Sequence, residues 1–494
     1  MIFSSYPYLI FLALTVAAFC VLEKRFPGLK RTFLLLVSLV FYAWWRVDFL
    51  ALLLGSTIVN FAIGTAITNR HHAGQNTRPL LIAGLTFNLG LIACFKYAGL
   101  LAASANELFA FGIPIPHLFL PLAISFFTFE QISYLADAAG GRAPRYSFLD
   151  YALFVSFFPH LIAGPIIRHN DLIPQFAQSR DQNKRSDDIA VGMTLFTIGL
   201  AKKTLIADNL APFSDAVFSA AHHGAAIGMA DAWMGTLFFA FQIYFDFSGY
   251  SDMALGSACL FGIRLPMNFN SPYKAASIIE FWRLWHISLS TFLRDYLYIP
   301  LGGNRRGPSR RYLNLFLTML LGGLWHGANW TFVIWGGLHG VYLIVNHGWR
   351  TLTRKFGLVA PRALQPVTHA LSILITFMAV VFAWTVFRAE SFASAARMTA
   401  GLAGAGGNRH LLIFGPLAAG ALATLFALIW LTPNSMEITW RLKPALETRY
   451  RDAGLRATRW QWKPNTATAI VFGLLFVVSV MALSNLSPFI YFQF

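Results

Sequence analysis

The sequence contains few charged residues, and acidic residues are the rarest of them. Asp, Glu, Lys and Arg make up 12% of its 494 residues, whereas about a quarter of a typical soluble domain is charged. This shortage excludes an ordinary cytosolic domain, a disordered regulator and a nucleic-acid-binding protein of the usual design. Because 56% of the residues are hydrophobic and 16% are aromatic, the composition predicts an integral membrane protein.

Cysteine and metal-ligand patterns are also scarce. The three cysteines, Cys20, Cys94 and Cys259, all lie in apolar runs, so the sequence predicts no disulfide framework. The adjacent pair His222–His223 has no other His or carboxylate at ligand spacing, and we therefore expect no metal site. The first apolar run lacks the basic start and the small-residue end of a cleavable signal peptide.

Apolar runs dominate the remainder of the chain, and each has roughly the 20 residues that a helix needs to cross the hydrocarbon core. They lie at 7–22, 32–45, 49–68, 80–98, 118–138, 189–208, 232–255, 312–328, 331–349, 368–387, 411–432 and 467–486. Basic clusters between the runs, the densest at 441–463, explain the net charge of +17 and are typical of cytoplasmic loops. The pattern predicts one all-α polytopic membrane domain over residues 1–494, with about 11–13 transmembrane helices and both termini outside.

Two segments differ from simple spans. Between Tyr151 and Arg168, Pro159 and Gly164–Pro165 would interrupt a helix, which favours a re-entrant hairpin buried in protein. In the segment 278–303, aromatic residues alternate with charged ones, so we expect an interfacial segment or one that dips partway into the membrane.

Ionisable side chains in apolar surroundings are costly, so each one marks a candidate site. His326 is the strongest, because glycines flank it in the apolar stretch 321–330. It could act on a substrate, or it could be a buried histidine bonded to a backbone carbonyl. His286 is the second candidate, although interfacial helices commonly carry His, Arg and Trp. The acids Glu130, Asp246 and Asp252 could form a proton or cation path. We favour a structural role in which they cap broken helices or neutralise Arg168 and Arg283.

Several residues after His286 could bind an anion. Arg294 and Asp295 could equally form a simple ion pair, and the turn 302–304 could present backbone amides to a phosphate. The basic pairs Lys202–Lys203 and Arg305–Arg306 could bind phosphates, or they could only follow the charge bias of cytoplasmic loops.

Three stretches, in this order, resemble the membrane-bound O-acyltransferase (MBOAT) superfamily. They are FWRLWHISLS at 281–290, RDYLYIPLGGNR at 294–305 and WHG at 325–327. Within the superfamily, the chain is most similar to the bacterial polysaccharide O-acetyltransferases, which include the alginate, cellulose and peptidoglycan acetylation proteins. The resemblance extends over about 120–350 and implies an MBOAT-like catalytic core there.

The resemblance also implies roles for individual residues. His326 matches the catalytic histidine and His286 the second motif position, with acetyl-CoA as the cytoplasmic donor and no permanently bound cofactor. A neutral imidazole can take the proton of an attacking hydroxyl, and His286 could orient the acceptor or stabilise the oxyanion. The candidates for substrate or CoA binding are Arg294, Asp295, Asn304, Arg305, Arg306 and Trp325.

The chain ends in an aromatic tail, SPFIYFQF at 487–494, directly after the last apolar run. One span after the basic cluster would place this tail on the extracytoplasmic side, where it could be an aromatic belt. The ending also resembles a tail associated with acyl relay in this group of systems, which implies Tyr491 as a covalent acetyl carrier. A phenol has a pKa of about 10, so its acetate is more activated than an alkyl ester.

We therefore expect a bacterial inner-membrane enzyme that passes acetyl from acetyl-CoA across the membrane for O-acetylation of an exported or cell-wall polysaccharide. The family implies an extracytoplasmic SGNH-like acetyltransferase and polysaccharide export machinery as partners, and no nucleic acid. The alternatives are a lipid or protein O-acyltransferase, a transporter of a glycan or acyl group, and a structural membrane subunit. A transporter should show inverted halves and dispersed charges, whereas the candidate residues here cluster between 246 and 330.

Overall fold

The computed structural model describes residues 1–116, 118–178, 182–358, 360–407, 415–446, 460–485 and 490. Within these ranges the chain is mostly helical and contains no strand, apart from an isolated bridge between Leu265 and Ala445. The α-helices are α1 (Tyr6–Arg25), α2 (Lys30–Ala43), α3 (Val47–His72), α4 (Arg78–Ile92), α5 (Ala98–Phe109), α6 (Ile124–Ala139), α7 (Phe148–Ser156), α8 (Phe158–Leu161), α9 (His169–Phe176), α10 (Gln182–Ala201), α11 (Asp208–His222), α12 (Met229–Leu260), α13 (Ile278–Leu284), α14 (Ile287–Leu293), α15 (Gly307–His326), α16 (Trp330–Lys355), α17 (Gln365–Arg388), α18 (Phe392–Leu402), α19 (Pro416–Leu431), α20 (Ser435–Ile438) and α22 (Thr466–Met481).

Three further segments are π-helical turns, in which the helix takes one extra residue per turn. They are η2 (Ala93–Tyr97), η3 (Lys202–Ala207) and η5 (Arg294–Tyr298). The first connects α4 to α5 and the second connects α10 to α11. Such turns are rare and occur often at functional sites, because the extra residue re-aims side chains.

Every predicted apolar run contains a helix, and the prediction of an all-α polytopic membrane protein is confirmed. Among the described residues, five helical stretches are long and apolar enough to cross a membrane: Tyr6–Arg25, Val47–His72, Arg78–Phe109, Lys184–His222 and Arg362–Arg388. Two shorter apolar helices, Pro416–Leu431 and Thr466–Met481, accompany them. The number of crossings and the side on which each terminus lies stay predictions.

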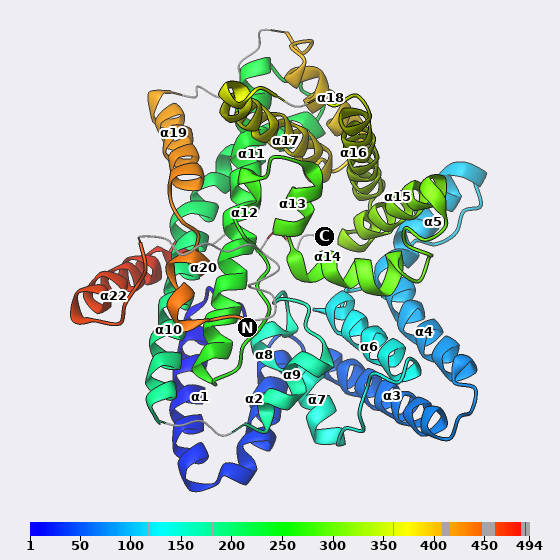
Figure 1. The fold of residues 1–494 in the computed structure, drawn as a ribbon, viewed down its shortest axis with the longest axis vertical. Coiled ribbons are helices and arrows are strands. Elements are labelled where there is room, and N and C mark those ends of the chain that lie inside the picture. The colour runs from blue at the N-terminus through cyan, green and yellow to red at the C-terminus, as the bar shows by residue number, and fades with distance from the viewer. Residues whose placement is uncertain are drawn as a thin grey trace.

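Helix α12 forms the centre of the molecule, and Figure 1 shows it passing through the middle of the bundle. All but one of its residues from Gly235 to Leu260 are buried, and it packs against α10, α11, α17 and α18. Helices α3, α4 and α6 fan out on one side, whereas α19 and α22 lie at the opposite edge (Figure 1). A helix that is buried on all sides needs no polar face toward solvent, which explains its many apolar and aromatic residues.

The segment 151–168 is a broken stretch inside the protein, as its prolines and glycine predict. Helix α7 ends at Ser156, the single turn of α8 follows, and the chain is then irregular until α9. All residues from 151 to 167 are buried. Side chains satisfy backbone groups freed by the break, because the Phe158 N–H donates to Ser38 Oγ (3.2 Å) and the Ile166 N–H to Ser288 Oγ (3.0 Å).

Helices α15 and α16 touch through glycines, so their backbones approach closely. A Cβ atom at Gly336 would overlap the Met319 carbonyl oxygen, and one at Gly323 would overlap the Phe332 carbonyl oxygen. Small residues allow such contacts between helices in membranes. At Gly337, by contrast, the nearest atom to an added Cβ would be a Leu320 methyl at 3.6 Å, an ordinary packing distance.

We predict that Gly336→Ala separates α15 from α16 and destabilises the protein by about 1–3 kcal/mol, the usual cost of overpacking. The neighbouring substitution Gly337→Ala has room for its methyl group and should leave the melting temperature unchanged or slightly raised. Thermal unfolding in detergent compares the two variants. Equal melting temperatures would contradict the close contact at Gly336.

Candidate active site

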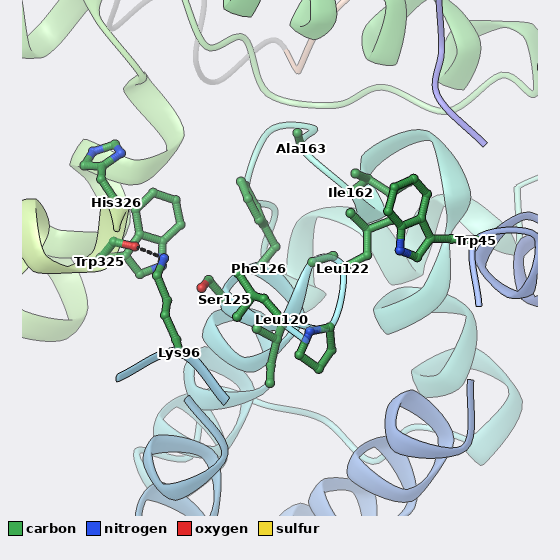
Figure 2. Close-up of a pocket in the computed structure, with 13 residues that line it drawn as sticks. Trp45, Lys96, Leu120, Leu122, Ser125, Phe126, Ile162, Ala163, Trp325 and His326 are labelled. Atoms are coloured by element: carbon green, nitrogen blue, oxygen red, sulfur yellow. Dashed lines mark hydrogen bonds between the residues drawn. The ribbon is translucent and has the colours of Figure 1, made fainter. Parts of the chain in front are cut away.

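A cavity of about 170 Å³ lies beside the C-terminal end of α15. Figure 2 shows its wall, to which the loop before α6, the broken segment, η2 and the last residues of α15 contribute. The lining residues are Trp45, Lys96, Leu120, Pro121, Leu122, Ala123, Ile124, Ser125, Phe126, Ile162, Ala163, Trp325 and His326. Two of the site residues predicted from the sequence, Trp325 and His326, therefore line the cavity.

His326 is the last residue of α15 and is only 4% exposed. The helix stops here because Gly327 is extended and Asn329 caps the next helix, α16, by accepting from the Thr331 N–H. Aromatic rings surround the imidazole on three sides, with centroid distances of 5.0 Å to Trp325, 5.0 Å to Trp335 and 5.6 Å to Phe387. The rings fix the imidazole at the wall of the cavity.

His286 is fully buried at the junction of α13 and α14. Its φ of 42° is in the left-handed region, which is uncommon for a residue other than glycine. Its ring lies 4.7 Å from the Phe247 ring and 6.1 Å from the Trp325 ring, between centroids. Trp325 thus stands between the two histidines, and the structure brings together three of the predicted site residues.

Asn268 fixes the turn that carries His286. Its carbonyl oxygen accepts from the Ile287 N–H at 3.0 Å, and its side-chain oxygen accepts from the Ser288 hydroxyl at 2.6 Å. Ser288 in turn accepts from the Ile166 N–H of the broken segment. Because strained backbone persists only where its surroundings hold it, these bonds explain how His286 keeps its conformation.

Lys96 also lines the cavity, although it is not among the residues predicted from the sequence. It lies in η2 and donates from Nζ to the Trp325 carbonyl oxygen at 2.6 Å, as Figure 2 shows. The Tyr97 hydroxyl donates to the Leu324 carbonyl oxygen at 2.7 Å. These carbonyls belong to the last turn of α15, whose C=O groups have no partner within the helix. Its position inside the apolar run 80–98 could have identified it from the sequence. An ionisable side chain in apolar surroundings is the same criterion that selected His326.

Arg294 and Asp295 lie in η5 and do not line this cavity. Asp295 accepts from Arg294 at 2.7 Å and also from Arg168, whose guanidinium lies over the Tyr296 ring. Burial favours the neutral acid, but the hydrogen bonds from Arg294 and Arg168 outweigh it and hold the pKa of Asp295 below its usual value. The geometry fits the ion-pair alternative, in which η5 anchors the broken segment.

The turn that follows η5 is exposed. Asn304, Arg305 and Arg306 are all at the surface and none of them lines the cavity at His326. Asn314 of α15 donates to the Gly303 carbonyl oxygen at 3.0 Å, which ties this turn to α15. Binding of CoA phosphates by these residues stays a prediction.

The buried acids have cationic or titratable partners, as a structural role requires. Glu130 pairs with His160 at 3.1 Å, Asp252 with Lys202 at 2.7 Å, and Asp246 with Lys203 at 2.9 Å. The partners are therefore not Arg168 and Arg283, as the sequence suggested. Lys202 and Lys203 also do not lie in a polar loop, because they belong to the helical turn η3.

The predicted carrier Tyr491 lies outside the described residues, but the preceding residue is described. Ile490 is 3% exposed, and its N–H donates to Asp246 Oδ2 at 2.9 Å. Asp246 is next to Phe247, whose ring contacts His286. Ile490 is thus bonded in the protein interior to α12, the helix that also contacts the candidate site.

A larger cavity of about 700 Å³ lies among α10, α19, α20 and α22. Neither histidine of the candidate site nor Trp325 lines it. Among the residues that the structure describes, no group of three or more His, Cys, Asp or Glu side chains is arranged to hold a metal ion.

Comparison with known proteins identifies similar chains. The sequence profile of MBOAT, the membrane-bound O-acyltransferase family, matches residues 139–387. A probable alginate O-acetylase AlgI of Pseudomonas aeruginosa is 41% identical over the whole of both chains. A peptidoglycan O-acetyltransferase of Helicobacter pylori is 44% identical over 77% of this chain and 75% of its own. A teichoic acid D-alanyltransferase of Bacillus subtilis is 28% identical over 63% of this chain and 83% of its own.

We predict that Ser288→Ala loosens the turn at His286. It leaves the buried Ile166 N–H without its acceptor, which costs about 1–3 kcal/mol, and it removes a bond to Asn268. The melting temperature and the activity should both fall. Ser290→Ala is the control, because the Ser290 hydroxyl makes only a 3.4 Å bond to the Trp285 carbonyl. If both variants behave alike, the Asn268–Ser288 contact does not hold the turn.

Proposed function

The chain belongs to the membrane-bound O-acyltransferase family, and we propose from this premise that it transfers acetyl groups for O-acetylation of a polysaccharide. The donor in this proposal is acetyl-CoA on the cytoplasmic side, and the acceptor polysaccharide is exported or part of the cell wall. Relatives named for the acetylation of alginate and of peptidoglycan support this substrate class. The bacterial inner membrane is the proposed location.

The observation that carries the proposal is the position of His326 at the wall of a small, closely lined cavity. A neutral imidazole has one nitrogen lone pair that accepts a proton. In the proposed step, the acceptor oxygen forms a bond to the thioester carbonyl carbon and passes its proton to His326. The C–S bond then breaks, and the imidazolium returns the proton to the sulfur, so that CoA leaves as a thiol.

The size of the cavity favours a short acyl group. Its volume of about 170 Å³ is well below the roughly 300–1,000 Å³ of a typical small-molecule pocket. An acetyl group with the end of its thioester fits this space, whereas a long acyl chain needs far more. The cavity thus supports acetyl-CoA over the long-chain donors of a lipid O-acyltransferase.

Tyr491 is the proposed carrier that takes the acetyl group from the site. The position of Ile490 supports this role, because its N–H bonds to Asp246 of α12, beside the residue that contacts His286. The phenol oxygen would attack the thioester with His326 as base, giving an aryl acetate that keeps its transfer potential. An extracytoplasmic SGNH-like acetyltransferase is the proposed recipient, and it acts together with polysaccharide export machinery.

Labelled acetyl-CoA and the protein purified in detergent test the proposal. We expect the C-terminal peptide to carry an acetyl group on Tyr491 by mass spectrometry, and CoA to be released. His326→Ala should abolish both signals, and Tyr491→Phe should abolish the adduct. CoA release that persists undiminished in His326→Ala would contradict the role of this histidine. Full polysaccharide acetylation in cells with Tyr491→Phe would contradict the carrier.

A second prediction concerns the anchor of the tail. Ile490→Pro removes the N–H that donates to Asp246 without changing α12, so the tail should lose its position and acetylation of Tyr491 should fall by at least tenfold. Ile490→Val keeps the N–H and should preserve the adduct. Adduct formation is measured at equal protein amount and equal melting temperature. An unchanged adduct in Ile490→Pro would show that the bond to Asp246 does not position the tail.

A further inference from the structure

Lys96 is a cation in the wall of the cavity, and the mechanism above gives it no task. Its ammonium group has three N–H donors, of which one bonds the Trp325 carbonyl oxygen at 2.6 Å. Among the residues that the structure describes, no carboxylate forms an ion pair with Lys96. The two lysines of η3 differ, because Lys202 pairs with Asp252, and Lys203 pairs with Asp208 and Asp246.

A cap for α15 does not explain a lysine at this position. The adjacent Tyr97 caps the neighbouring carbonyl of Leu324 with a neutral hydroxyl. A neutral donor would satisfy the Trp325 carbonyl equally well, at a much lower cost of desolvation than an ammonium ion. A cation retained in an apolar wall therefore points to negative charge that arises inside the cavity.

The contacts of Lys96 place its charge close to His326. The bond to Trp325 holds Nζ at the residue that directly precedes His326, and the ammonium also lies 5.9 Å from the centroid of the Trp325 ring. Both Lys96 and His326 line the same cavity, and Figure 2 shows them on either side of Trp325. The imidazole of His326 and the ammonium group of Lys96 are thus both held at the C-terminal end of α15.

We propose that Lys96 stabilises the oxyanion that forms when an acyl thioester is attacked beside His326. The inference rests on the proposed function, because it assigns a further residue to the same reaction. As the acceptor oxygen bonds to the carbonyl carbon, the C=O electron pair moves to the carbonyl oxygen, and Lys96 donates an N–H to that oxygen. Lys96 keeps all three of its protons. The C=O bond re-forms as the C–S bond breaks, and the sulfur takes the proton held by His326.

The inference predicts a loss in kcat rather than in binding. An interaction made only in the transition state lowers kcat and leaves KM for acetyl-CoA nearly unchanged. Loss of one oxyanion donor typically costs 100- to 1000-fold in kcat. We expect a loss of this size in Lys96→Met, measured as CoA release by the full chain in detergent with acetyl-CoA as the probe.

Tyr97→Phe is the matched control. It removes the neighbouring hydrogen bond to the end of α15, at the Leu324 carbonyl, but leaves the ammonium group of Lys96 in place. It should reduce kcat by no more than a few-fold, while its melting temperature falls about as much as that of Lys96→Met. Lys96→Gln keeps an N–H donor for the Trp325 carbonyl and lacks the charge. It guards against misfolding of the Met variant, and it should also lose at least 30-fold in kcat.

Three results would overturn the assignment. Equal losses of kcat in Lys96→Met and Tyr97→Phe would make Lys96 only a helix cap. A wild-type kcat in Lys96→Gln would show that the charge is dispensable, and a rise in KM alone would make Lys96 a binding residue for the donor. If the wild-type chain itself releases no CoA from acetyl-CoA, the proposed function fails and the role of Lys96 fails with it. If the wild-type chain releases CoA and His326→Ala does not, the proposed function holds. The Lys96 variants then test the role of Lys96 alone.

Discussion

Helix α15 ends inside the protein, and the arrangement of the candidate site follows from how its last carbonyl groups are satisfied. Lys96 and Tyr97 reach the Trp325 and Leu324 carbonyls from η2. Unpaired carbonyls would be costly in apolar surroundings. The same bonds fix the end of α15 on one side, while the contact with α16 at Gly336 fixes it on the other.

The three π-helical turns place charged side chains where a regular helix would not. Lys96 is in η2, Lys203 in η3, and Arg294 with Asp295 in η5. Turns η2 and η3 connect helical segments without a loop, and η5 extends α14, so an ionisable group enters the bundle while most backbone hydrogen bonds are kept. In η3 and η5 the charges bond to opposite charges. In η2, by contrast, Lys96 bonds to a backbone carbonyl and lines the cavity beside His326, and its proposed role in catalysis rests on this difference.

Local patterns predicted the helices well and the contacts poorly. An apolar run of about 20 residues is a local property, and all twelve runs contain helices. The break at 151–168 was equally visible, because Pro159 and Pro165 act on their own neighbours. Lys96 was missed although its apolar setting was plain, since its partner Trp325 is 229 residues away. The anchoring of Ile490 by Asp246 spans 244 residues, and no spacing rule indicates such a contact.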